Sequence, residues 1–434
     1  MSTNNVLNNL FNQSVETWIL EALDQSINCF EDLVLALPGV DPTYIFRVLN
    51  RIYQSSPERR RLIKEVIAGT EIQNTSSSNA PAKTLLPPPH PLDYDWRFSQ
   101  EAIEQLLHHC IRVAPFNGTI ALLGTPSLVH PLASSSYPYH TVLLDSNHTA
   151  SSSFKGLGTR VQTLTHNLLE NSLPDFSANV VVLDPPWYPE YIHPFLWSAS
   201  QLCNINGYIF ASLPPVGTRP GIQDEWDKTL DLASFLGLRL LDLEELSLSY
   251  MTPPFEKNVF RFEGLPVISN NWRRGNLVIF VKEKHILSPR PTVPSYEKPW
   301  IETQLFGVRM RIRPWEINRF EDPSLISIVP NDVLTSVSRR DPRRKFADVW
   351  TSGNRIFKCK GRSILSQILE SIAGGHDPLT FVEESLNRPL DNQQAQLIFR
   401  TREQILTLAR TEHKENLLCG YYWSSAERIS LAAS

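Results

Sequence analysis

The feature that most constrains the fold of this chain is a series of short apolar runs separated by helical segments. Each run has the length and the aliphatic or β-branched content of a buried strand. The predicted strands are 119–123, 141–144, 161–163, 180–183, 208–212, 239–242 and 276–282, and the predicted helices among them are 100–113 and 192–203. Strands that alternate with helices form mostly parallel sheets covered on both faces. We therefore predict an α/β domain with a Rossmann-like sheet over residues 93–285.

Two further domains and a linker are expected around this sheet. Residues 1–71 carry helical patterns, and residues 72–92 form a Ser/Asn/Pro-rich tract that cannot bury a core and suits a semi-rigid linker. Residues 286–434 begin with β-leaning stretches at 305–313, 325–329 and 348–357 and end in helical patterns at 363–372 and 392–411. The prediction is a helical N-terminal domain and an α+β C-terminal domain.

The N-terminal segment resembles the helix-turn-helix core of winged-helix domains. Three short helices are expected, and the third has Asp41 as its N-cap, Pro42 at its first position, and Arg47 and Arg51 along its length. A helix of this kind can enter a DNA major groove, and the same bundle equally serves packing or dimerisation. Either nucleic acid or a protein partner, including a second copy of the chain, is therefore expected here.

The composition of the whole chain limits the partners, metal sites and cellular locations that can be expected for the protein. A net charge of -4 over 434 residues means that a nucleic-acid partner needs local basic patches. The five cysteines are scattered without a CxxC pair, which fits reduced thiols and predicts no metal site. No apolar run approaches the roughly 20 residues that span a bilayer, and the N-terminus lacks the features of a signal peptide. A cytoplasmic protein without membrane contact is expected.

Polar residues follow four of the predicted strands. Gly124, Asp145, Asn167 and Asp184 come directly after or shortly after the first four strands of the sheet. Ligands of open α/β sheets bind outside the carboxyl ends of the strands, and an acid about 20 residues beyond the first glycine reaches a ribose hydroxyl. Asn167 is placed to contact an adenine edge. The four residues together indicate a nucleoside-type cofactor, although each alone also suits an ordinary turn.

The stretch "LDPPWYPEY" ends the fourth strand with a stiff loop. Asp184, Pro185, Pro186 and Trp187 combine one carboxylate, a backbone carbonyl without a competing N–H, and one large ring. The carboxylate and the Pro185 carbonyl can accept both N–H groups of a planar amine, and the Trp187 ring can stack on a base. The plainer interpretation is a strand-to-helix turn with a capping acid and an anchored tryptophan.

The order of these motifs resembles the S-adenosylmethionine-dependent methyltransferases, in particular the amino-methylating group whose fourth motif reads [DNS]-PP-[YFW]. The resemblance covers about residues 93 to 284 and departs from the family at "GTPSLVH", which replaces its glycine-rich loop. It implies that Gly124 and Asp145 hold the cofactor and that "LDYDWRFS", with Asp95, lies near its methionine end. The arrangement is also similar to the branched-polyamine synthases, which carry more acids around the site.

The resemblance implies methyl transfer from S-adenosylmethionine to an exocyclic amino nitrogen, with adenine N6 in DNA or RNA as the leading acceptor. In this interpretation the catalytic residues are Asp184, Pro185, Pro186 and Trp187. Two alternatives stay open: an aminopropyl- or protein N-transferase that uses the same pocket, and a non-catalytic assembly or nucleic-acid-binding protein with a degenerate fold. The departure at "GTPSLVH" favours the second alternative.

Several residues outside these motifs are candidates for substrate contact. Alternating Arg309, Arg311 and Arg313 are predicted to project from one strand face. With a compact basic loop nearby they can neutralise phosphates, although a solvated charged face explains the pattern as well. The substrate-binding candidates are Tyr188, Arg219, Tyr250, Phe255, Arg339, Arg340, Arg343 and Arg344.

Overall fold

The computed structural model divides the chain into two compact units. It describes residues 3–69, 86–136, 138–154, 156–169, 172–266, 268–293, 300–316 and 319–419. The first unit comprises Met1–Thr75, Trp96–Thr252 and Leu265–Ser295, and the second comprises Ser76–Asp95, Pro253–Gly264 and Tyr296–Ser434. Within the described residues no helix is long and apolar enough to cross a membrane, and no group of three or more potential ligands is arranged to hold a metal ion.

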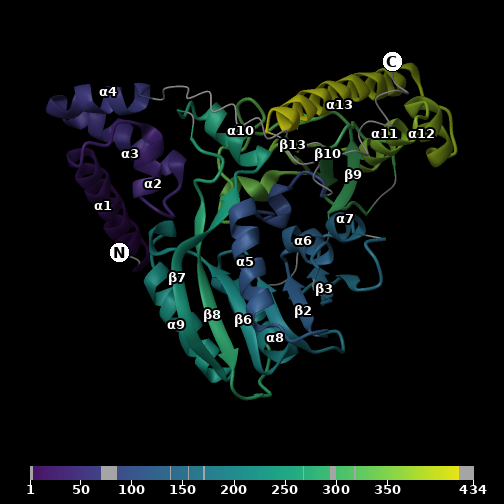
Figure 1. Ribbon diagram of the computed structural model, residues 1–434. Coiled ribbons are helices and arrows are strands. Elements are labelled where there is room, and N and C mark those ends of the chain that lie inside the picture. The colour runs from purple at the N-terminus through teal and green to yellow at the C-terminus, as the bar shows by residue number, and fades with distance from the viewer. Residues whose placement is uncertain are drawn as a thin grey trace. The chain divides into compact units, whose positions relative to one another are not determined.

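An eight-stranded sheet forms the centre of the first unit (Figure 1). Its strands are β1 (Arg97–Phe98), β2 (Thr119–Leu123), β3 (His140–Asp145), β4 (Val161–Thr165), β5 (Ala178–Leu183), β6 (Cys203–Leu213), β7 (Leu238–Met251) and β8 (Arg274–Lys282). The strand order is β1-β7-β8-β6-β5-β2-β3-β4. Strands β4-β3-β2-β5-β6 are parallel and follow the 3-2-1-4-5 order of doubly wound folds. Strand β8 is antiparallel to both of its neighbours, β6 and β7, so β7 runs in the direction of the parallel strands. The predicted Rossmann-like α/β fold is confirmed.

Helices cover both faces of this sheet. They are α5 (Gln100–Val113), α6 (Val129–Ala133), α7 (His148–Ser152), α8 (Pro189–Leu202) and α9 (Ile222–Phe235). The α8 and α9 side chains share one apolar core with Ile209 and Ala211 of β6. Phe210 points to the opposite face, since side chains alternate along a strand, and there its ring meets His109 of α5 at 5.5 Å between centroids. Burial on both faces explains the nearly continuous apolar runs of the sequence.

The N-terminal part of the first unit is helical. It consists of α1 (Thr3–Asp24), α2 (Phe30–Ala36), α3 (Pro42–Ser55), a 3-10 turn (Pro57–Arg59) and α4 (Arg60–Ala68). Asp41 caps α3 as predicted, because its carboxylate accepts from the backbone N–H groups of Thr43 and Tyr44. Residues 3–69 contain helices and no strand, so the wing of a winged-helix domain is not seen in this range and that resemblance stays unconfirmed. Arg47 donates from Nε to the Thr43 carbonyl, so part of its hydrogen-bonding capacity is used within α3.

The second unit is an α+β structure, as predicted. Its five-stranded sheet has the order β11-β13-β12-β10-β9, built from β9 (Ile301–Leu305), β10 (Val308–Ile312), β11 (Ile326–Ser327), β12 (Val349–Thr351) and β13 (Ile356–Lys358). Its helices are α10 (Pro254–Phe262), α11 (Arg362–Gly374), α12 (Pro378–Leu386) and α13 (Asn392–Leu418). The stretch 348–357 is a hairpin rather than one strand, since Asn354 turns the chain with a φ of 65°.

The predicted linker falls partly outside the described residues. Its last residues, 86–92, are described within the second unit, and 86–91 are buried. His90 is fully buried, and the Pro88 carbonyl accepts a hydrogen bond from Arg309 at 3.2 Å. This end of the tract is therefore packed chain rather than an exposed spacer.

Candidate active site

The four strand-end residues lie at one edge of the sheet, after the neighbouring strands β2, β3, β4 and β5; they are Gly124, Asp145, Asn167 and Asp184. Leu123, the last residue of β2, is in register with Leu144 of β3 and with Leu183 of β5. Gly124 and Asp184 therefore follow adjacent strands, and the N–H of Asp184 donates to the Leu123 carbonyl at 3.2 Å. The strand order reverses between β2 and β5, which is the switch point where doubly wound sheets bind ligands.

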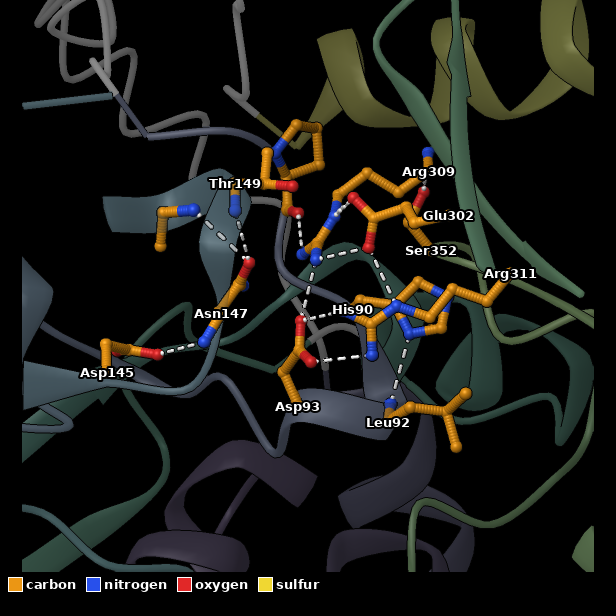
Figure 2. Close-up of polar contacts among 12 residues, drawn as sticks. His90, Leu92, Asp93, Asp145, Asn147, Thr149, Glu302, Arg309, Arg311 and Ser352 are labelled. Atoms are coloured by element: carbon orange, nitrogen blue, oxygen red, sulfur yellow. Dashed lines mark hydrogen bonds and ion pairs between the residues drawn. The ribbon is translucent and has the colours of Figure 1, made fainter. Parts of the chain in front are cut away.

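The loops after β3 and β4 are held by their own polar side chains, and Figure 2 shows those after β3. Asp145 accepts at Oδ1 from the backbone N–H of Asn147 at 2.7 Å, and Asn147 in turn caps α7 by accepting from Thr149. Asn167 accepts at Oδ1 from the N–H of Leu169 at 3.0 Å. Asp145 and Asn167 thus stiffen turns in addition to any ligand contact, as Asx residues commonly do.

Three buried polar atoms near this edge have no hydrogen-bond partner among the described residues. They are Thr125 Oγ1 after β2, Ser151 Oγ in α7 after β3, and His166 Nε2 after β4. Buried polar groups are nearly always satisfied, so unsatisfied groups in three successive strand-end loops call for a ligand or water. Sequence reasoning missed these residues, since a single Thr, Ser or His in a loop carries no distinguishing pattern.

The loop after β5 is held to β7 by a hydrogen bond to Asp184. Tyr250 of β7 donates its hydroxyl to Asp184 Oδ1 at 2.7 Å, and the same hydroxyl is hydrogen-bonded to the Ser212 hydroxyl of β6. Burial and the adjacent Asp184 carboxylate hold the pKa of Tyr250 well above its ordinary value of 10, so the tyrosine stays a neutral donor. Tyr250 is 1% exposed. It therefore positions Asp184 instead of forming an open wall for a substrate.

Trp187 is buried, which leaves its ring faces less accessible than the predicted stacking on a base would need. Its ring is 6% exposed and meets the Tyr250 ring edge-on at 5.6 Å, with 84° between the planes. The Arg273 guanidinium lies 4.3 Å from its centroid. Gly275 makes this packing possible, because a Cβ there would approach Trp187 Cζ2 to 2.8 Å. A base can reach the faces of this ring only if neighbouring groups move.

Two other candidates form a pair on the same unit. The Arg219 guanidinium lies over the Tyr188 ring at 5.2 Å and forms an ion pair with Glu225 of α9. The charge of Arg219 is therefore already balanced within the fold, which weakens it as a phosphate contact. Pro185 and Pro186 precede this pair in the stiff loop, and the Tyr188 N–H donates to the Pro186 carbonyl at 2.6 Å.

The remaining candidates belong to the second unit. Phe255 lies in α10 and is 1% exposed, so it is a core residue there. Arg343 is paired with Asp341 at 2.6 Å, and this contact holds the pKa of Arg343 above its ordinary value. Arg344 lies over the Trp350 ring at 4.6 Å. The other candidates of this unit are Asp95 and Arg339, which are half-buried, and Arg340, which is exposed.

The predicted basic strand face is an internal ion cluster (Figure 2). Arg309 of β10 has a fully buried side chain and pairs with Asp93 at 2.7 Å and with Glu302 of β9 at 2.8 Å. Arg311 pairs with the same two acids. Burial alone would raise the pKa of Glu302, but Arg309 and Arg311 outweigh it and hold that pKa well below its ordinary value. Arg309 and Arg311 therefore stabilise the second unit, and the expectation that this face binds phosphate is wrong for them.

Comparison with known proteins gives matches only among solved structures. No family model matches the chain, and no curated protein matches it. A branched-chain polyamine synthase mutein from Thermus thermophilus, in complex with N4-aminopropylspermidine and 5′-methylthioadenosine, is 12% identical with a TM-score of 0.49, covering 67% of this chain and 95% of that one. The non-mutein synthase matches with 12% identity and a TM-score of 0.46, over 65% of this chain and 90% of that one. A TehB-like SAM-dependent methyltransferase from Corynebacterium glutamicum is 11% identical, with a TM-score of 0.30 over 42% of this chain and 89% of that one. The fold class of the chain rests on its own strand order.

Proposed function

We propose that this chain is an S-adenosylmethionine-dependent transferase that methylates an exocyclic amino nitrogen, with N6 of adenine in DNA or RNA as the acceptor. One observation carries the proposal: Asp184 follows β5 at the switch point of a doubly wound sheet, on the strand adjacent to Gly124. A carboxylate with a proline carbonyl beside it is thereby held next to the loop where such sheets bind nucleoside ligands.

The strand-end loops suit the cofactor. Gly124 has a φ of 66° and leaves little room for any side chain, because a Cβ would come within 3.2 Å of the Phe195 ring. Thr125, Ser151 and His166 offer hydrogen bonds that no described residue uses. The Asp145 carboxylate ends β3, a position from which an acid in a doubly wound sheet reaches a ribose hydroxyl. When bound, S-adenosylmethionine supplies a methyl group on a positively charged sulfur.

The loop after β5 suits an amine acceptor. The Asp184 carboxylate and the Pro185 carbonyl are two acceptors on consecutive residues, and proline has no N–H to compete. Hydrogen bonds from both N–H groups of a planar amine favour a pyramidal nitrogen whose lone pair points away from the acceptors. Tyr250 fixes the orientation of the carboxylate through its 2.7 Å hydrogen bond. Much of the rate acceleration then comes from positioning, and Asp184 can accept the nitrogen's proton after transfer.

Calorimetry and labelled-methyl transfer test this function in two steps. The full-length chain is titrated with S-adenosylmethionine and then incubated with methyl-labelled cofactor and DNA, RNA or total protein. We expect cofactor binding and label transfer to DNA or RNA. Label in protein would redirect the proposal to a protein N-transferase, and absence of binding at millimolar cofactor would refute the proposed methyltransferase function.

Two variants of Asp184 separate catalysis from structure. Asp184→Ala removes both acceptor oxygens, whereas Asp184→Asn keeps one acceptor for the Tyr250 hydroxyl and loses the charge. We expect both to abolish transfer while cofactor affinity stays near that of the wild type. An equal loss of binding and transfer in Asp184→Asn would show that the loop is structural.

A further inference from the structure

Arg273 is a cation beside the acceptor loop that sequence reasoning passed over. It directly precedes β8, and its carbonyl accepts from the Tyr250 N–H at 2.9 Å. Its guanidinium carbon lies 4.2 Å from the centroid of Trp96 and 4.3 Å from that of Trp187. We call these three side chains the Trp-Arg stack. The contact with Trp187 places the charge on the DPPW loop itself.

The charge of Arg273 is not balanced by an acid among the described residues. Its Nε is buried and makes no hydrogen bond, and no described carboxylate pairs with the guanidinium. By contrast, Arg219 on the neighbouring loop pairs with Glu225. The Arg273 guanidinium carbon lies over both rings, and the N–H groups of a guanidinium match a carboxylate or phosphate. A half-buried guanidinium that has ring contacts but no described acidic partner is suited to bind a ligand anion.

We propose that Arg273 binds a phosphate of the acceptor, so that the acceptor of the DPPW loop is a nucleotide unit of nucleic acid. This inference rests on the proposed function and assigns the residue that would contact the acceptor's phosphate. We assign the anion to the acceptor because Arg273 lies over Trp187 of the acceptor loop. Arg273 also lies over Trp96, in the segment that the resemblance places near the methionine end of the cofactor, so the cofactor carboxylate is the competing source that the test must separate. A polyamine acceptor is disfavoured, since Arg273 repels a polycation and Arg219 is already neutralised.

A pair of ligands that differ only by a phosphate tests the assignment. Adenosine and adenosine 5′-monophosphate are titrated into the full-length wild type and into Arg273→Gln. The control is Arg274→Gln, the next residue, which is exposed and whose replacement changes the net charge equally. We expect the wild type and Arg274→Gln to bind the monophosphate at least about tenfold more tightly than adenosine, and Arg273→Gln to lose this preference. Spermidine is expected to bind the wild type no better than it binds Arg273→Gln.

Three further measurements keep the result decisive. Arg273→Lys retains the charge without the planar fork and is expected to keep part of the phosphate preference, which also guards against misfolding of the glutamine variant. S-adenosylmethionine is compared with its decarboxylated form, and a loss in Arg273→Gln confined to the carboxylated cofactor would overturn the assignment to the acceptor. Equal monophosphate preference in wild type and Arg273→Gln, or none in either, would also overturn it. Methyl transfer is assayed on the same preparations, so transfer without phosphate preference would leave the proposed function standing while this inference fails.

Discussion

Replacing Tyr250 with phenylalanine tests how the fold holds the catalytic carboxylate. The substitution keeps the ring, which packs against Phe98 at 5.0 Å and against Trp187, and removes one oxygen. That oxygen donates to Asp184 at 2.7 Å and also contacts the Ser212 hydroxyl. The change therefore releases the carboxylate from β7 without opening a large cavity.

The expected magnitude follows from the charge on the acceptor. A hydrogen bond to a charged group contributes about 1.5–3 kcal/mol, and each 1.36 kcal/mol is tenfold in rate. If the oriented carboxylate is needed in the transition state, kcat for methyl transfer should fall about 10- to 150-fold. The free energy of unfolding should also fall by about 1–3 kcal/mol, because the buried Ser212 hydroxyl loses its partner.

Steady-state kinetics at saturating cofactor separate the two effects. We expect the fall in kcat for Tyr250→Phe with cofactor affinity unchanged by calorimetry. Ser212→Ala is the matched control, because it removes the other neighbour of the same hydroxyl and leaves the hydrogen bond to Asp184 in place. Wild-type kcat in Tyr250→Phe, or an equal fall in Ser212→Ala, would refute the positioning role.

The raised pKa of Tyr250 adds a pH test. The stability that it contributes is complete below about pH 10 and is lost as the pH rises further towards the raised pKa. The free energy of unfolding measured in urea should therefore fall more steeply above pH 10 for the wild type than for Tyr250→Phe.

Three further substitutions probe the packing around the site and the second unit. Gly275→Ala should cost about 1–3 kcal/mol of unfolding free energy and shift the fluorescence of Trp187, because the new Cβ would overlap the ring; unchanged urea midpoint and spectrum would contradict the packing. Gly124→Ala should weaken cofactor binding, since a φ of 66° costs a side chain about 1–2 kcal/mol, and calorimetry that shows wild-type affinity would speak against this loop as the cofactor site. Glu302→Gln should cost about 3–5 kcal/mol at pH 7, because it leaves Arg309 undercompensated. The depressed pKa of Glu302 means that its contribution is present above about pH 4.5 and lost as the pH falls, so the variant should lose less stability on acidification, as urea titrations at pH 7 and pH 3 would reveal.

The sheet and its strand-end residues could be predicted because their signals are local. Helix 100–113 and strand 119–123 were predicted with the bounds that the structure has, since apolar periodicity and flanking turn residues lie within the segments themselves. The edge formed by Gly124 and Asp184 follows from parallel strands that place their carboxyl ends together. The long strand β7 was predicted only at 239–242, because Asp242, Glu244 and Glu245 interrupt its apolar run beyond that point.

What each site residue touches was decided by the tertiary structure alone. The partner of Asp184 is Tyr250, 66 positions along the chain, and the cation on Trp187 is Arg273, still further away. No local pattern encodes such pairs.

The arginines of β10 also show that tertiary contacts decide what a side chain does, but here the contacts contradict the predicted role in phosphate binding. Their alternation determined that Arg309 and Arg311 share a strand face, as the sequence predicted. Whether that face met phosphate or protein depended on Asp93, which lies more than 200 residues earlier and reaches it only in the folded chain. Sequence by itself thus determined which side chains lie together on one strand or at one sheet edge, because backbone geometry repeats locally. The tertiary structure decided which charged side chains form ion pairs inside the fold and which can bind a ligand. This choice depends on the charged groups that distant segments bring within hydrogen-bond distance.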